Sequence, residues 1–169
     1  MSSSGSISIN RSNSKGYFKK MRCAQLIEKV DSDGKIRAII VKNDFKKTGI
    51  SFFTPHDFSQ QLAYINHSKG KIIEPHKHNS LPRQILLTQE VLMLKKGTLR
   101  VDFYDDNNKY LESRILEAGD VILLASGGHG FEVLEEIEMI EVKQGPYSEE
   151  QDKVRFENID KTIKIRGKP

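Results

Sequence analysis

The sequence is poor in cysteine and in long apolar runs, and each shortage argues against a class of protein. Cys23 is the only cysteine among the 169 residues, which excludes an internal disulfide and a cysteine-based zinc cluster. No apolar run exceeds a few residues, so we expect no membrane span, and the serine-rich start lacks the apolar stretch of a secretory signal. With 37% hydrophobic and 30% charged residues, the composition predicts one soluble globular domain, which we expect in the cytoplasm.

A basic groove for nucleic acid is also missing. The net charge of +4 comes from the two ends, because residues 1–22 carry five basic and no acidic side chains and residues 153–169 carry six basic and two acidic ones. Residues 23–152 hold the other 16 basic and 21 acidic side chains, a net charge of −5. Binding to a phosphate backbone needs clustered lysine and arginine, and stacking on single strands needs aromatic residues among them. Neither pattern is present, so we expect no nucleic-acid partner.

Short apolar segments separated by turn residues are what the chain has instead. Residues 26–30 and 36–41 flank the turn sequence Asp-Ser-Asp-Gly and predict a β-hairpin. Residues 99–103 and 111–116 flank Asp-Asp-Asn-Asn and predict a second hairpin. Evenly spaced short strands of this kind favour an all-β barrel or sandwich over any arrangement of alternating strands and helices.

Two more segments extend this series of strands, and helix is scarce. Residues 121–124 are continuously apolar, which is consistent with a fully buried strand, and residues 137–144 close the series. Only residues 57–63, with aspartate or serine as a possible cap, could supply a turn or two of helix.

Three histidines and one glutamate suggest a metal site. In an extended strand successive side chains alternate between faces, so His76 and His78 point the same way. Glu90 shares its face with two leucines that follow at alternate positions, so its carboxylate would point into an apolar interior. Burial there is costly unless the charge is paired, hydrogen-bonded or bound to a metal. His129 lies between glycines, which let the backbone bend and approach closely.

The spacing of these residues resembles the first sequence motif of the cupin family. That motif is glycine, five residues, His-x-His, three or four residues, glutamate, six residues and glycine. The matching positions here are Gly70, His76, His78, Glu90 and Gly97. The gap between His78 and Glu90 is longer than in the family, since eleven residues intervene.

The second cupin motif is similar to the sequence that starts at Gly119. Gly127 and His129 fit it with one residue fewer before the histidine, Ala125 replaces the proline, and no asparagine follows. The resemblance covers roughly residues 65–145. It implies a single cupin barrel, a double-stranded β-helix or jelly roll, with a flanking N-terminal β-hairpin. It also implies a set of metal ligands, with Glu74 as a competing carboxylate: His76, His78, Glu90 and His129.

These ligands would suit one divalent transition metal, either zinc, iron, manganese or nickel. Four protein ligands leave two positions open on a six-coordinate metal, enough for a substrate that chelates through two oxygens. The conceivable proton-transfer bases are His67, Glu74 and Tyr147. The candidate substrate-binding side chains are Gln144, which is in phase with inward-facing apolar residues, and Arg83 and Gln84, with a hydrogen-bonded amide and a solvated loop as the respective alternatives.

The closing segment is similar to the end of cupin domains in sugar-phosphate isomerases and polysaccharide-biosynthesis proteins. Residues 144–156 contain a Gly-x-Tyr turn, an acidic stretch and a basic-apolar-arginine triplet, and the alternation at 154–156 predicts a last strand. The resemblance implies a metal-dependent isomerase or epimerase for a small carbohydrate-like substrate. A non-haem iron oxygenase and a non-catalytic ligand-binding protein stay open as alternatives.

The domain boundaries and the oligomeric state can also be predicted. We expect residues 1–20 to form a disordered, basic, serine-rich tail, residues 21–156 the cupin barrel, and residues 157–169 a basic C-terminal tail. Small cupin barrels commonly associate, and the first hairpin leaves a strand edge that needs cover, so we expect a homodimer.

Overall fold

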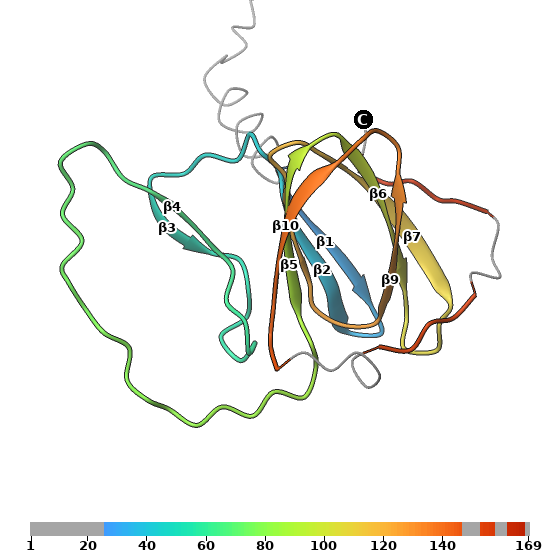
Figure 1. The fold of residues 1–169 in the computed structure, drawn as a ribbon, viewed down its shortest axis with the longest axis horizontal. Helices are drawn as coiled ribbons and strands as arrows, with labels where there is room; N and C mark the ends of the chain where they lie inside the picture. The colour runs from blue at the N-terminus through green and yellow to red at the C-terminus, as the bar shows by residue number, and fades with distance from the viewer. Residues whose placement is uncertain (1–25, 147–152, 158–161, 168–169) are drawn as a thin grey trace, which may run out of the picture.

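The computed structural model describes residues 26–146, 153–157 and 162–167, and these contain ten β-strands and no helix (Figure 1). Three antiparallel sheets result, with strand orders β1-β2-β8-β5-β10, β7-β6-β9 and β3-β4. The predicted all-β class is confirmed, and the described residues include no helix that could cross a membrane. The strands are β1 (Ile27–Ser32), β2 (Lys35–Val41), β3 (Gly49–Phe52), β4 (Ala63–Asn66), β5 (Glu90–Lys96), β6 (Thr98–Tyr104), β7 (Tyr110–Glu117), β8 (Val121–Leu124), β9 (Gly128–Val133) and β10 (Glu138–Lys143).

Both predicted hairpins are confirmed, and their turns show why they form. Asp33 and Gly34 connect β1 to β2 with φ angles of 52° and 71°, the positive values that a two-residue type I′ turn requires. In the turn between β6 and β7, the Asp105 carboxylate accepts hydrogen bonds from the backbone amides of Asn107 at 2.8 Å and Lys109 at 2.9 Å. An aspartate that satisfies turn amides in this way stabilises the reversal.

The short helix expected at residues 57–63 is wrong. This segment is a series of turns, because side chains bind the backbone groups that a helix would use. The side-chain amide of Gln61 donates hydrogen bonds to the backbone carbonyls of Pro55 and Phe58, and the backbone amide of Leu62 donates to the hydroxyl of Thr54. Local side-chain bonds of this kind compete with helix formation.

The main core lies between the five-stranded and the three-stranded sheets. Alternate residues of each strand point into this space, so Leu92 and Leu94 of β5 meet Leu99 and Phe103 of β6. Phe103 is only 1% exposed, and burying a side chain of this size contributes about 2–3 kcal/mol. The other buried members of the cluster are Val30, Ala38, Ile40, Val101, Leu116, Ile122 and Leu124.

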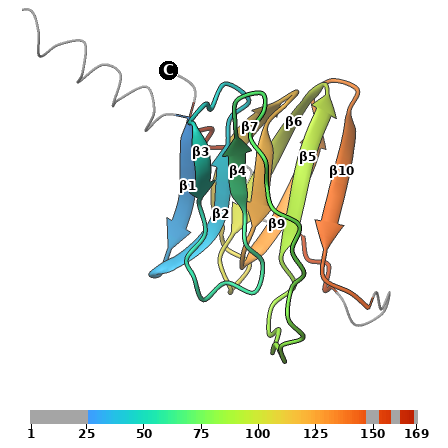
Figure 2. The same cartoon turned by 90° about the vertical axis from the view of Figure 1, so that its left-hand side faces the viewer.

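A second apolar layer lies on the outer face of the five-stranded sheet. Strands β3 and β4 form a hairpin in front of this face (Figure 2). Phe53 and Leu62, which flank this hairpin's inner ends, belong with Phe58 to the cluster around the buried residues Ile39 and Leu123. The continuous apolar run of β8 is explained, because its side chains are buried on both faces of the sheet, as predicted.

The C-terminal segment covers the edge of the three-stranded sheet that β7 forms. The Ser113 amide of β7 donates a hydrogen bond to the carbonyl of Lys164 at 2.9 Å, and the Arg166 amide donates to the carbonyl of Ser113 at 3.0 Å. The strand expected at residues 154–156 is wrong, since the described residues there pair with no sheet. Phe156 packs edge-on against Tyr104 instead, with ring centroids 5.1 Å apart.

Residues 67–88, which we name the arm, connect β4 to β5 without forming a strand. In Figure 1 this green segment swings away from the two packed sheets. Residues 71–88 are exposed throughout. The strand expected around the His-x-His sequence is therefore wrong. Pro75 and Pro82 lack the amide hydrogen that a strand ladder uses, which weakens strand formation here.

Candidate metal centre

Glu90 and His129 meet in the space between the two packed sheets. Glu90 is the first residue of β5 and shares its face with the core residues Leu92 and Leu94, as the sequence predicted. His129 lies on β9 directly opposite the core residue Phe103, so its ring also points inward. The Nε2 atom of His129 is 3.3 Å from Oε2 of Glu90, and their side chains are 30% and 18% exposed. The pair is thus shielded on the core side and accessible at the end of the interior.

Two charged residues of β10 extend this pair, and sequence analysis missed both. Lys143 pairs with Glu90 across the ladder, and its Nζ atom is 4.0 Å from Oε1 of Glu90. The same Nζ atom is 3.7 Å from Oε1 of Glu141, which also lies on the inward face of β10. The signal that could have found them is the alternation of Glu141 and Lys143 with the apolar residues of the opposite face. We name Glu90, His129, Glu141 and Lys143 the interior cluster.

His76 and His78 lie on the arm, outside the interior cluster. Their rings contact each other edge-on, with centroids 5.5 Å apart, although no strand holds them. The Nδ1 atom of His76 is 2.9 Å from the backbone carbonyl of Glu74, which leaves Nε2 to face solvent. The two imidazoles are therefore held close together, as a pair of ligands requires, but on an exposed segment.

The four expected ligands accordingly form two separate pairs. Among the described residues, no three histidine, cysteine, aspartate or glutamate side chains are grouped closely enough to hold a metal ion. The donor types suit a divalent transition metal, because imidazole nitrogens and a carboxylate oxygen are its usual ligands. The positions of these groups in a single chain do not suit a metal ion, since His76 and His78 lie on the exposed arm and Glu90 and His129 lie between the sheets.

Gln144 lies on the opposite side of the five-stranded sheet from the interior cluster. Its Oε1 atom accepts a hydrogen bond from the backbone amide of Gln89 at 2.7 Å, and its Nε2 atom donates to Gln60 at 3.2 Å. Gln144 is in phase with Ile140 and Val142, as noted in the sequence, but these residues lie on the outer face. The expectation that Gln144 faces the interior is therefore wrong, because the strand's phase was assigned to the wrong face.

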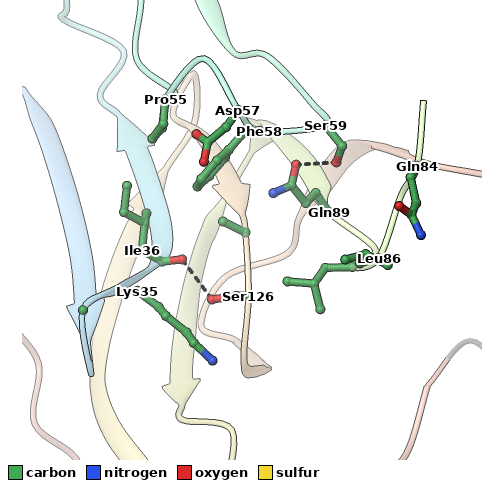
Figure 3. A pocket seen from close by; sticks show the side chains of 13 residues that line it. Lys35, Ile36, Pro55, Asp57, Phe58, Ser59, Gln84, Leu86, Gln89 and Ser126 are labelled. Carbon is green, nitrogen blue, oxygen red and sulfur yellow. Dashed lines mark hydrogen bonds between the residues drawn. The ribbon is translucent and has the colours of Figure 1, made fainter. Parts of the chain in front are cut away.

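A pocket of about 470 Å³ lies on that outer side (Figure 3). Figure 3 shows Gln84 and Leu86 of the arm facing Lys35 and Ser126 across it, with residues 55–59 closing a third side. No expected metal ligand lines this pocket. Its floor includes members of the outer apolar cluster, so it is an opening between the arm and the sheet rather than a part of the interior cluster.

The remaining predicted site residues are scattered. Arg83 and Glu74 are exposed on the arm, and His67 is half-buried where the arm begins. Tyr147 lies outside the described residues. Among the described residues, Arg83, Glu74 and His67 make no hydrogen bond or ion pair with the interior cluster.

The interior cluster brings together two carboxylates, an imidazole and an ammonium group at an accessible end of the apolar core. Such a set can bind a cation, hold an anionic oxygen or move a proton. Comparisons of this chain with known protein families, with curated proteins and with solved structures found no match.

Proposed function

We propose that the protein is a cupin-type enzyme that isomerises or epimerises a small, polar, carbohydrate-like molecule with the help of one divalent transition metal. The observation that carries the proposal is the contact of 3.3 Å between His129 and Glu90, whose side chains point inward from two facing sheets. A carboxylate that begins a core-facing strand is costly unless something compensates its charge. Its placement beside an imidazole is the arrangement that half of the expected ligand set needs.

The packing of two antiparallel sheets supports the cupin assignment, although neither sheet of the described chain closes into a barrel. A jelly roll packs two antiparallel sheets face to face, and the chain packs five strands against three in this manner. The expected motif residues Glu90 and His129 lie on strands of different sheets, where both can face the interior. A bound metal ion, held by these two residues together with His76 and His78, would supply Lewis-acid chemistry at this end of the interior.

The chain's own residues offer the groups that an isomerisation needs beside such a metal. Isomerisation removes a proton from the carbon next to a carbonyl and returns a proton to the neighbouring carbon. The Lys143 ammonium is placed to stabilise the negative oxygen that forms in between. The Glu141 carboxylate, 3.7 Å from Lys143, is a better candidate for the proton transfer than His67 or Glu74, because it faces the interior cluster.

The non-catalytic alternative rests on a different observation. The outer pocket of about 470 Å³ is in the size range of small-molecule sites, and Gln84 and Gln89 line it with Lys35. A ligand held there would make the protein a binding module. An iron oxygenase would use the same four ligands as the isomerase, and oxygen consumption by the iron-loaded protein would reveal it.

Metal content is the first test of the proposed function. We expect the wild-type protein, equilibrated with zinc and freed of excess metal by gel filtration, to retain about one zinc per chain. His129→Ala and Glu90→Gln should each lower zinc retention by at least about tenfold. The matched control is His56→Ala, which removes a histidine from an exposed turn and should leave the zinc content unchanged. Equal zinc content in all four proteins would overturn the proposal.

Ligand binding is the second test. Calorimetric titration of the zinc-loaded protein with sugar phosphates, nucleotide sugars and small hydroxy acids should find a ligand whose binding depends on zinc. Lys143→Ala should weaken that binding by about tenfold or more, because it removes the positive charge that faces the substrate. Lys35→Ala, in the outer pocket, should not. The opposite pattern would favour the binding module.

A further inference from the structure

The two separated halves of the expected metal site point to an exchange between two copies of the chain. We infer that the arm of one copy lies along the free edge of β9 in a second copy, so that each metal site is built from both chains. This inference rests on the proposed metal site. Four kinds of observation carry it: unpaired backbone edges, exposed apolar side chains, complementary charge and the division of the ligands.

The backbone of the arm and the edges of the sheets lack complementary partners. In the described chain, β9 pairs only with β6 and β10 only with β5, so each leaves one ladder edge open. Over residues 72–87 the arm makes no backbone-to-backbone hydrogen bond with another described residue. An extended segment can add to an open edge as a new strand and satisfy both sets of groups. Residues 71–79 span about 30 Å when extended, enough to follow the whole of β9.

The side chains on both surfaces are apolar and exposed. Ile72 and Ile73 of the arm are 71% and 60% exposed. Phe131 and Val133 of β9 point toward the core side of the sheet, opposite Val101 and Leu99, and are nevertheless 42% and 56% exposed. Inward-facing residues are exposed only where the interior is open. A strand laid along β9 would cover them, and burial stabilises by about 25 cal/mol per Å² of apolar surface.

The charges of the two surfaces are opposite. The arm carries four basic side chains and one acidic side chain. Residues 128–143, which form β9, β10 and their connection, carry five glutamates and one lysine. Two of these glutamates, Glu136 and Glu138, pair with Lys96 and Lys95 at exposed positions, where such pairs are worth little and exchange readily. Electrostatic attraction therefore favours the approach of an arm to this edge.

The course of the arm favours a second copy over the chain's own β9. Its first end is fixed by the pairing of β4 with β3, and its last end by Gln89, whose side chain accepts a hydrogen bond from the Gln60 amide at 3.1 Å. Both anchors lie on the outer face of the five-stranded sheet, whereas β9 belongs to the other sheet. Between its anchors the arm extends away from both sheets (Figure 1). It thus presents its two histidines beyond the chain's own surface.

An exchange of arms would complete both sites at once. His76 and His78 of the partner subunit would approach Glu90 and His129, and the reciprocal exchange would complete the second site. Reciprocal insertion of an identical element by each of two copies produces a closed, symmetric dimer. The exchange also gives a structural reason for the homodimer expected from the sequence, because the metal site is incomplete in a single chain.

Mixing two inactive variants tests the exchange directly. One variant carries His76→Ala and His78→Ala on the arm, and the other carries His129→Ala in the barrel. Each alone should retain little zinc. After the two are unfolded together and refolded, one site in every mixed dimer combines an intact arm with an intact barrel. Random pairing makes about half of the dimers mixed, so zinc content should recover to about a quarter of the wild-type value per chain.

The controls separate failure of the exchange from failure of the proposed function. A mixture of Glu90→Gln with His129→Ala has two damaged barrels and should recover no zinc. If the wild-type protein binds zinc but the arm and barrel variants do not complement each other, the arm closes on its own chain and this inference is overturned. If the wild-type protein binds no zinc, both the proposed function and the inference fail.

A measurement without metal guards against variants that do not fold. Wild-type chains labelled with ¹⁴N and ¹⁵N are refolded together and treated with a carbodiimide, which joins amines to carboxylates in direct contact. We expect cross-links between Lys77 and the glutamates of residues 131–143 that join chains of different isotopic mass. Cross-links found only within chains of one mass would contradict the exchange.

Discussion

The packed sheets carry charged residues at both of their lateral ends, where the edge strands lie: β1 and β7 at one end, β9 and β10 at the other. The charges at the first end are covered, and those at the second are partly exposed to solvent. At the β1 and β7 end, Glu28 is 3.0 Å from Arg114 and Lys42 is 2.8 Å from Asp120, and all four side chains are largely buried. Burial raises the pKa of Glu28, and the nearby charges of Lys42 and Arg114 act against that rise. At the β9 and β10 end, His129 and Glu141 of the interior cluster are 30% and 43% exposed, and the described contacts within the cluster are 3.3–4.0 Å long.

The two ends differ in how far the neighbouring chain covers their charged side chains. The C-terminal segment covers β7 through bonds to Ser113, so the charges at this closed end have fixed partners and little access to solvent. No described strand covers β9 or β10 beyond their pairing with β6 and β5. The charged side chains at the open end are those that the proposed metal ion, substrate or arm would meet.

The largest expected effect comes from breaking an ion pair at the closed end. Arg114→Ala removes the cation that Glu28 and Glu112 share and leaves them only Lys42 and Arg166, so we expect a loss of about 2–3 kcal/mol in the free energy of unfolding. The matched change at the open end, Lys143→Ala, should cost less, about 1 kcal/mol, because the contacts of Lys143 are longer, at 4.0 and 3.7 Å, and Glu141 is 43% exposed. Urea denaturation of both variants measures the difference. Equal losses would mean that the two ends do not differ in the way described.

A smaller effect is expected from Asp106, whose pKa is lowered to about 2 by hydrogen bonds from Arg37 and Lys35. A carboxylate with a lowered pKa stabilises the folded state above its ordinary value of 3.8, and this contribution disappears as the pH falls through about 2. Wild-type stability should therefore fall more steeply between about pH 5 and pH 2 than that of Asp106→Asn. Asp44→Asn, an exposed control, should retain the wild-type slope.

Thermal unfolding at several pH values would record this difference. Because Asp106 is exposed and Arg37 is buried, the test also shows whether a single surface carboxylate compensates the buried guanidinium. Identical pH profiles for wild type and Asp106→Asn would show that it does not.

The sequence predicted the regular part of the fold because the information there is local. The Asp-Gly turn before β2 and the Asp105 turn before β7 each specify a reversal through a few residues. Glu90 was placed on the correct face because strand alternation puts it on the same face as Leu92 and Leu94. Predictions of this kind depend on spacing within one strand, and spacing can be read without knowing the neighbours.

The predictions that failed depended on partners far away in the chain. Gln144 was assigned to the wrong face because nothing in its own strand tells which side the β3–β4 hairpin covers. The role of residues 162–167 beside Ser113 was not visible, since a single parallel bridge leaves little pattern. The course of the arm was also beyond sequence analysis, because alternation predicts a strand without showing whether an edge is available to pair with it.

We propose that both halves of the ligand set meet at the open end. Zinc titration of the wild-type protein, followed by NMR of the histidine ring signals, is the sharpest test of this proposal. We predict that the signals of His76, His78 and His129 change together and reach saturation at one zinc per chain, while that of His56 does not change. Changes limited to His76 and His78, with the His129 signal unaffected, would contradict the proposal that both halves of the ligand set hold one metal ion.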